Sequence, residues 1–286
     1  MNETLLRVKN LSVSFPSPKG EVTAVKNVSL AMGKEKIGIV GESGSGKSVT
    51  GRAILRLLPS YARIEADQIV YQGHDLQRCS EKEMRRIRGM GISMVMQDPK
   101  YSLNPVRTVG KQISEAYTIH HQVSKDEAKV QTLKMLEAVR IRNPEQVYRL
   151  YPHEVSGGMG QRIMIAMMLI PEPGLMIADE PTSALDVTVQ LQVLAILDDL
   201  VSERGMGLIF ISHDLELVSS FCDRIIIMYG GRIMEIIEAA KLQNSRHPYT
   251  RGLLNCLPKI DGDRTQLPVL ERDDAWLGDD NHNLTG

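Results

Sequence analysis

The sequence predicts an α/β protein with a mainly parallel sheet and helices on both of its faces. Three short apolar runs, 37–40, 175–178 and 208–211, have the length of buried strands; the first meets the glycine-rich residues 41–46, and the other two end at polar residues. Helical patterns alternate with them, most clearly the amphipathic pattern over 187–200. Strands that alternate with helices favour a parallel sheet. Because ligands of such sheets bind beyond the carboxyl ends of the strands, we expect the functional residues there.

The N-terminal part predicts strands and then a strand–turn–helix unit. Residues 5–15 and 22–30 alternate roughly as strands do. The apolar run 37–40 leads into the glycine-rich residues 41–46, after which a helical pattern continues through Leu58.

The middle of the chain changes from strand-like to mainly helical patterns. Residues 81–89 are densely charged and predict a solvated helix face. The run 92–96 is apolar and strand-like, whereas 109–150 shows a helical pattern without a clear strand, which indicates an all-α insert. After residue 232 the pattern weakens. Residues 261–286 are acidic, polar and rich in turn formers, and we expect the last ten or so to be disordered.

Composition excludes several classes of protein. The chain has 286 residues, of which 42% are hydrophobic and 24% charged, as in ordinary soluble domains. A formal net charge of −1 provides no overall basic field for nucleic acid. The longest strongly apolar stretch, 163–170, stops at Pro171, whereas a membrane-spanning helix needs about 20 residues. We therefore expect any membrane role to be exercised through a partner.

The cysteines and the N-terminus indicate a reducing compartment. Cys79, Cys222 and Cys256 lie far apart in the sequence and form no CxxC pair, so we expect free thiols. The first ten residues lack a basic start followed by an apolar run, and we expect no signal peptide.

The glycine-rich loop between the predicted strand and helix fits the phosphate-binding pattern GxxxxGK[ST]. Such a loop points successive backbone N–H groups inward, and the helix N-terminus adds a positive dipole end. The lysine reaches the β- and γ-phosphates, and the hydroxyl after it ligates Mg²⁺. A glycine-rich turn with an incidental lysine is the alternative. The residues are Gly41, Glu42, Ser43, Gly44, Ser45, Gly46, Lys47 and Ser48.

Two carboxylates follow the apolar run 175–178. Asp179 stands where a phosphate-binding protein needs an aspartate for the Mg²⁺ shell. Glu180 follows it, placed to orient or deprotonate the attacking water. A lone acidic pair at a strand end is usually a solvated turn, but its combination with the phosphate loop favours the catalytic interpretation.

With these motifs in place, the sequence resembles the ATP-binding-cassette family over residues 5–255. Residues 155–159, VSGGM, look like the family's signature. A helix N-terminus with bare glycine amides can face a phosphate, and the resemblance implies that this phosphate belongs to ATP on the partner subunit's phosphate loop. The nucleotide contacts that it implies beyond the loop octet are Val49, Ser156, Gly157, Gly158 and Met159.

Further elements follow in the family's order. Gln97 resembles the Q-loop glutamine that senses Mg²⁺ and the attacking water, so the implied metal ligands are Ser48, Gln97 and Asp179. His213, after the run 208–211, resembles the switch histidine that contacts the γ-phosphate.

Two more nucleotide contacts are implied. Asp186 closes the segment 183–186, which resembles the family's D-loop. Phe15 stands where the family carries an aromatic residue that stacks on adenine, although it could equally belong to the core. Gly160 departs from the family, which usually has a basic or polar residue there, and glycine inside a helix costs about 1 kcal/mol relative to alanine.

The resemblance implies a fold and its division. We expect a P-loop NTPase of the ABC type, with a RecA-like parallel-sheet core, an N-terminal antiparallel β subdomain and an α-helical subdomain. The nucleotide-binding domain should cover 1–255, with the helical subdomain at about 100–165. Residues 256–286 should form a short, partly disordered C-terminal extension.

Four segments narrow the resemblance to the dipeptide, oligopeptide and nickel importer branch, and to the first ATPase of its pair. They are 93–99, 102–105, 161–167 and 246–254, and the dipeptide Arg88-Gly89 points to the same branch. The implied function is the ATP-hydrolysing subunit that powers import of peptides or related small solutes. The alternatives are an importer of nickel, metal chelates or opines, and a soluble ABC ATPase without a transport role.

The implied assembly contains several partners. These are a paralogous second ATPase in a head-to-tail dimer, two integral membrane permease subunits and, indirectly, a substrate-binding protein, with no nucleic acid. The cofactors are ATP and Mg²⁺. The location is peripheral, on the cytoplasmic face of the bacterial inner membrane, with the segment 97–110 expected to pass motion to the permeases.

Overall fold

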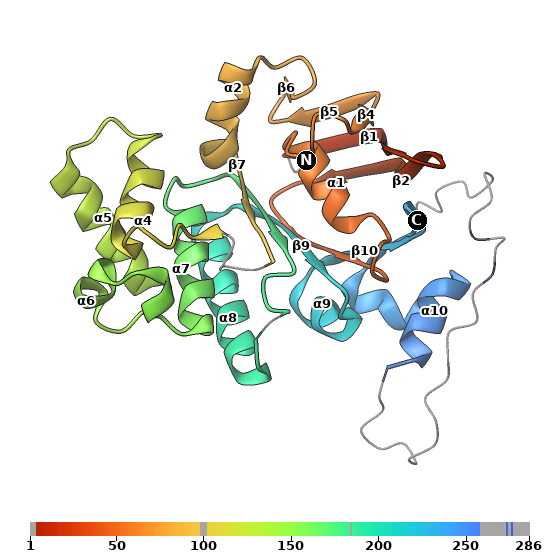
Figure 1. Ribbon diagram of the computed structural model, residues 1–286. Coiled ribbons are helices and arrows are strands. Elements are labelled where there is room, and N and C mark those ends of the chain that lie inside the picture. The colour runs from red at the N-terminus through yellow and green to blue at the C-terminus, as the bar shows by residue number, and fades with distance from the viewer. Residues whose placement is uncertain (1–3, 98–101, 184, 258–272, 274–275, 277–286) are drawn as a thin grey trace, which may run out of the picture. The chain divides into compact units, whose positions relative to one another are not determined.

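The computed structural model describes residues 4–97, 102–183, 185–257, 273 and 276 (Figure 1). The chain divides into two compact units, which are treated separately below. The first consists of residues 1–77 together with 210–286, and the second of residues 78–209. Strand β9 (Gly207–Ser212) crosses this boundary along the chain.

The first unit contains an antiparallel sheet whose strand order is β2-β1-β5-β6, with β4 also paired to β1. The long hairpin of the first two strands dominates it, and Leu6, Val8, Leu11 and Val13 are buried, with a register shift between Val8 and Leu11 that moves the alternation by one residue. The strands are β1 (Leu6–Ser17), β2 (Gly20–Met32), β4 (Arg63–Glu65), β5 (Gln68–Tyr71) and β6 (His74–Asp75).

A second group of strands in this unit leads to the phosphate loop. Strand β3 (Lys36–Val40) pairs in parallel with β10 (Arg224–Tyr229), and β10 pairs antiparallel with β11 (Arg232–Glu238). Both β3 and β10 are largely buried. The helices are α1 (Lys47–Ile54), α9 (Leu215–Phe221) and α10 (Pro248–Asn255), with a 3₁₀ segment at Ala239–Asn244.

Helix α1 is shorter than the sequence predicts, because it ends at Ile54 rather than Leu58. Arg56 adopts a left-handed conformation, with φ 53°. Its N–H donates to the carbonyl of Ala53, and the next N–H, of Leu57, donates to that of Arg52. This pair of bonds is a Schellman ending, which satisfies the last carbonyls of the helix and turns the chain away.

The second unit is mainly helical around two parallel strands. β7 (Ile92–Val95) pairs with β8 (Leu175–Asp179), and every residue of both strands is buried. Helix α4 packs against three other helices, α5, α6 and α7 (Figure 1). The helices are α2 (Glu81–Arg86), α4 (Val109–Thr118), α5 (Lys125–Ala138), α6 (Pro144–Arg149), α7 (Gly157–Leu169) and α8 (Val187–Arg204), with short irregular turns at Ile87–Gly91 and Pro152–Glu154.

These elements confirm the α/β class, with an antiparallel N-terminal sheet and parallel strands elsewhere. The domain boundaries given above stay a prediction. Three sequence interpretations lie outside the described residues: Asp98–Pro99 in the branch motif, Ala184 in the D-loop segment, and most of the 256–286 extension. Within the described part of the chain, no helix is both long enough and apolar enough to span a membrane.

Candidate functional site

The phosphate loop lies between buried strand β3 and helix α1. The amide N–H of Ser45 donates to the carbonyl of Glu42, at 3.2 Å, which closes the loop on itself. Gly46 is left-handed, with φ 97°, and a Cβ placed on it would lie 2.6 Å from the carbonyl oxygen of Ala24. A Cβ on Gly41 would lie 2.0 Å from the carbonyl oxygen of Met228. The surrounding backbone therefore leaves no room for a side chain at either end of the loop.

Lys47 holds the loop from inside. Its Nζ donates to the carbonyls of Gly41 and Glu42, both at 2.8 Å, and to Oγ of Ser45 at 3.4 Å. The residue is only 5% exposed. A buried cation at the N-terminus of a helix favours an anion at this position.

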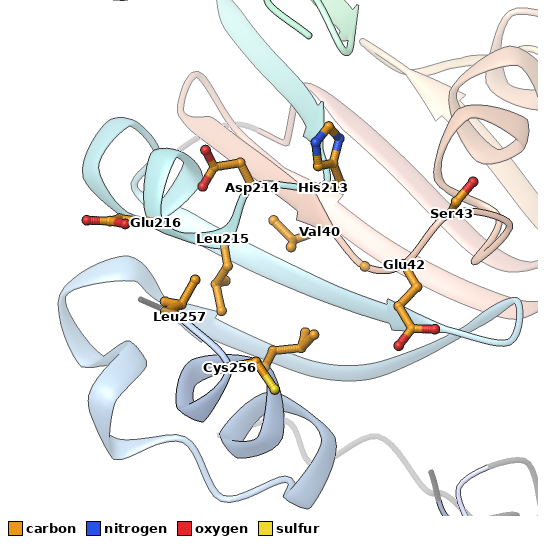
Figure 2. Close-up of a pocket in the computed structure, with 11 residues that line it drawn as sticks. Val40, Glu42, Ser43, His213, Asp214, Leu215, Glu216, Cys256 and Leu257 are labelled. Atoms are coloured by element: carbon orange, nitrogen blue, oxygen red, sulfur yellow. The ribbon is translucent and has the colours of Figure 1, made fainter. Parts of the chain in front are cut away.

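A pocket of about 770 Å³ opens beside the loop. Figure 2 shows Glu42 and Ser43 of the loop and His213 around it, with Cys256 at the end of α10 on a further wall. His213 follows β9 and precedes α9, whose first turn is capped by Asp214 through a 2.9 Å bond from the Leu217 N–H. The structure thus places His213 at the same pocket as the start of the phosphate loop.

The second unit carries the acidic pair at the end of β8. Asp179 is 2% exposed. Glu180 takes a left-handed backbone conformation, with φ 48°, which is uncommon for a residue with a side chain. Nε2 of Gln97 donates to Oε2 of Glu180 at 3.0 Å and also approaches Oγ of Ser183, at 3.5 Å. Oγ of Ser183 in turn donates to the carbonyl of Glu180 at 3.2 Å.

Glu180 is therefore fixed by two neighbours, on its side chain and on its backbone. Non-glycine residues in left-handed conformations cluster at functional sites, where the surrounding structure holds them. The contact of Ser183 with Gln97 is a feature that sequence reasoning did not identify. The only signal was that Ser183 stood in the segment resembling the D-loop.

The signature residues form the N-terminus of α7. Oγ of Ser156 caps the helix by accepting from the N–H of Met159, at 3.4 Å. Gly157 has open space around it, whereas a Cβ on Gly158 would lie 2.6 Å from Cγ1 of Val189 in α8. At the start of the helix, Gly157 therefore has free space beside it, whereas Gly158 is packed closely against α8. Gly160, where the sequence departs from the family pattern, lies in the first turn of α7. It is buried, and its N–H donates to the Ser156 carbonyl.

A cationic pocket of about 600 Å³ adjoins Ser156. Arg140, Arg142 and Arg162 line it. Arg162 also braces the signature turn, because its Nε donates to the carbonyl of Gly158 and its Nη1 to that of Arg140. Burial lowers the pKa of Arg162, and the charge of Arg142 lowers it further. Arg140 forms an ion pair with Asp199, so Arg142 and Arg162 are the two lining arginines whose charge favours an anion near the signature turn.

Phe15 and Asp186 are the two remaining candidates for nucleotide contact. Phe15 is half-buried rather than part of the core, and its ring meets Tyr61 edge-on, with centroids 6.4 Å apart. Tyr61 is 64% exposed and gave no recognisable signal in the sequence. Oδ1 of Asp186 accepts from the Val189 N–H at 3.0 Å and so caps α8.

Comparison with known proteins agrees with this geometry. Residues 25–183 match the ABC transporter family. A probable peptide ABC transporter ATP-binding protein, y4tR of Sinorhizobium fredii, is 47% identical over 94% of this chain and 81% of its own. The dipeptide transport ATP-binding protein DppD of Bacillus subtilis is 46% identical over the same shares. The solved ATP-binding cassette MJ0796, a dimer with ADP and phosphate, has a TM-score of 0.73 at 26% identity, covering 82% of this chain and 98% of that one.

The chain therefore belongs to the ABC transporter family, and the resemblance inferred from its motifs is confirmed. It is an ATP-binding cassette whose hydrolysis of ATP powers transport.

Proposed function

We propose that this chain is the ATP-hydrolysing subunit of a bacterial importer for peptides or related small solutes. The hydrogen bond between Gln97 and Glu180, at the end of β8, is the observation that supports a role in hydrolysis for these two residues. The substrate class is supported by relatives named for peptide and dipeptide transport that share 46–47% identity over 94% of the chain.

ATP binding begins at the phosphate loop. The amides of residues 41–49 surround the phosphates, and Lys47 turns its ammonium group from the loop carbonyls toward the β- and γ-phosphates. Because the lysine is already buried, little side-chain freedom is lost on binding. Phe15, half-buried at the end of the β1–β2 hairpin, stacks on the adenine ring.

Hydrolysis requires a base and an oriented water. Glu180 accepts the proton of the attacking water, and the amide of Gln97 holds its carboxylate in place. His213 contacts the γ-phosphate from the loop side, in the pocket where it already lies. Most of the rate enhancement then comes from positioning and charge stabilisation, as is usual in phosphoryl transfer.

Mg²⁺ is the metal that this set of side chains fits. Ser48, Gln97 and Asp179 supply a hydroxyl, an amide oxygen and a carboxylate, which are the hard oxygen donors that Mg²⁺ prefers. When bound with ATP, the ion neutralises charge on the β- and γ-phosphate oxygens.

The signature turn serves a second ATP in a head-to-tail dimer. Ser156, Gly157, Gly158 and Met159 face the phosphates and ribose held on the partner's phosphate loop, and Asp186 approaches the same nucleotide. The open space at Gly157 and the arginine-lined pocket beside Ser156 support this orientation, because both suit an anionic ligand.

The remaining assembly follows from the transport role. The second ATPase is a paralogue of this chain, two membrane permease subunits complete the complex, and a substrate-binding protein delivers the cargo. The ATPases are peripheral, on the cytoplasmic face of the inner membrane. The segment 97–110 passes the closing motion of the dimer to the permeases.

Uptake by the assembled transporter tests the substrate class. Proteoliposomes that contain both ATPases and both permeases, with the binding protein outside and ATP inside, should accumulate a labelled oligopeptide but not nickel or an opine. The matched complex with Glu180→Gln should accumulate none. Uptake of nickel or opine in place of peptide would refute the substrate assignment. Full ATP turnover by the ATPases without the membrane subunits would refute the transport role.

The head-to-tail arrangement has a separate test. Ser156→Arg places a bulky side chain at the start of α7 and should lower nucleotide occupancy at the partner's phosphate loop. A selective loss at this chain's own Lys47 would contradict the arrangement.

A further inference from the structure

Helix α10 belongs to a segment of the branch motif, 246–254, to which the proposed function assigns no role. It begins at Pro248, with His247 as its cap, whose Nδ1 accepts from the Tyr249 N–H at 3.1 Å. Tyr249 is the largest fully buried side chain among the described residues, at 0% exposed. A tyrosine that is completely buried needs a partner for its hydroxyl group.

That hydroxyl reaches the phosphate loop. Oη of Tyr249 accepts from the amide N–H of Glu42 at 3.4 Å, across 207 residues of sequence. The carbonyl of Glu42 accepts from Nζ of Lys47 at 2.8 Å and from the N–H of Ser45 at 3.2 Å. Glu42 therefore joins the two systems, with its N–H held by α10 and its carbonyl held by the phosphate-binding lysine.

An aromatic cluster keeps the tyrosine ring in place. The ring centroid of Tyr249 lies 4.7 Å from that of Tyr229, at the end of β10. It lies 5.6 Å from the ring centroid of Trp276, which the Tyr249 ring meets edge-on. The turn after β10 also contacts the loop, because the N–H of Gly231 donates to the carbonyl of Ser45 at 3.2 Å. Ring packing of this kind adds to simple burial and restricts the position of the hydroxyl.

The end of α10 lies on the same pocket as the loop. Leu253, Cys256 and Leu257 line the cavity that Glu42 and Ser43 also line, and Figure 2 shows the helix on one wall of it. The helix thus supports the beginning of the phosphate loop both by a hydrogen bond and by forming a wall of the same cavity.

We infer that Tyr249 is a positioning residue for ATP binding, fixing the Glu42 peptide so that the loop is preorganised before the nucleotide arrives. The inference rests on the proposed function. Without the hydroxyl, the Glu42 peptide keeps its carbonyl contacts but loses one restraint on its N–H, and ATP binding must restore that part of the order. Because the ordered loop is needed equally in the ground state and the transition state, the loss should appear in KM and not in kcat.

The chain offers a matched pair of variants for the test. Tyr249→Phe removes only the hydroxyl that accepts from Glu42. Tyr229→Phe removes a hydroxyl from the same cluster; within the described part of the chain, Tyr229 makes ring contacts but no hydrogen bond to the loop. Trp276, the single tryptophan of the sequence, touches both rings, so its fluorescence reports whether each variant keeps the cluster intact.

ATPase kinetics in the assembled complex should separate the two variants. Losing one hydrogen bond corresponds to roughly 3- to 10-fold in affinity. We expect Tyr249→Phe to raise KM for ATP by that factor with kcat within about 2-fold of wild type, and Tyr229→Phe to leave both constants unchanged. Amide hydrogen exchange at Glu42 should be protected in the wild type without nucleotide and faster in Tyr249→Phe.

Equal KM values for the two variants, or a loss confined to kcat, would overturn the positioning role. So would a Tyr249→Phe protein that is less stable but binds ATP normally, since that marks a purely structural residue. Should the variant fail to fold, rapid exchange of the Glu42 amide in the wild type would by itself overturn the inference, and protection would support it. A wild-type complex that neither binds nor hydrolyses ATP would overturn the proposed function together with the inference.

Discussion

Substituting alanine for Gly46 should damage the phosphate loop far more than the same change at Gly44. Both glycines are left-handed, with φ 97° at Gly46 and 80° at Gly44. They differ in their surroundings, because a Cβ on Gly46 would lie 2.6 Å from the carbonyl oxygen of Ala24 and 3.3 Å from Cγ2 of Val25, whereas a Cβ on Gly44 would have nothing within 4 Å.

The expected magnitudes follow from these two contributions. A left-handed backbone costs a residue with a Cβ about 1–2 kcal/mol, and both variants carry this cost. The overpacking at Gly46 adds roughly 1–3 kcal/mol, because the obstructing atom belongs to the backbone of β2 and cannot rotate away. Gly46→Ala should therefore lower the free energy of unfolding by about 2–5 kcal/mol, and Gly44→Ala by about 1–2 kcal/mol.

Urea unfolding of the two variants measures this difference as a shift in midpoint at unchanged slope. The ATP affinity of the folded protein, followed by Trp276 fluorescence, reports whether the loop itself has moved. Equal midpoints and equal affinities for the two variants would refute the steric argument and show that the loop adjusts freely around Gly46.

Three further predictions concern single side chains. Lys47→Ala removes the buried cation that we propose binds the phosphates, so equilibrium binding should show ATP affinity reduced by about 10- to 100-fold; unchanged affinity would contradict its role. Burial raises the pKa of the Cys222 thiol to about 12, so iodoacetamide at pH 8 should label Cys79 and Cys256 before it, and preferential labelling of Cys222 would count against its burial. Burial also lowers the pKa of His247 below its usual 6.5, an effect that Glu235 opposes. The unfolded chain then binds more protons below about pH 6.5, so stability should fall on acidification from that pH down to the folded-state pKa. Thermal melts should show this fall in the wild type and a weaker one in His247→Asn, which keeps a capping acceptor; identical pH profiles would exclude His247 as its source.

Much of the fold and of the site follows from short-range patterns. The apolar runs 37–40, 175–178 and 208–211 predict the buried strands, since each is short and ends abruptly, the first at a glycine-rich segment and the other two at polar residues. The phosphate loop is equally local, because its glycines and its lysine lie within eight residues.

Other features depend on contacts that no local pattern encodes. Strands β4, β5 and β6 have two to four residues each, too few for a periodicity to emerge, and are held by pairing with β1 or with one another. The end of α1 is set by the left-handed Arg56, a residue type without a turn preference. The bond between Tyr249 and Glu42 joins residues 207 positions apart and follows only from the packed structure.

The constraint on Glu180 belongs to the same class. Its position after a buried strand is visible in the sequence, but its left-handed backbone and its bond to Gln97, 83 residues away, are not. These two features support the catalytic role proposed for Glu180.

The most direct test of the account is ATP turnover by Glu180→Gln in a transporter whose partner ATPase carries an inactivated site. Glu172→Gln provides the control, because Glu172 is also left-handed, with φ 61°, but is exposed. The account predicts that Glu180→Gln binds ATP like the wild type and hydrolyses it at least about 10²-fold more slowly, the usual scale for a lost general base, while the control stays normal. Near-normal turnover by Glu180→Gln would contradict the assignment of the base and, with it, the catalytic meaning of the Gln97–Glu180 pair.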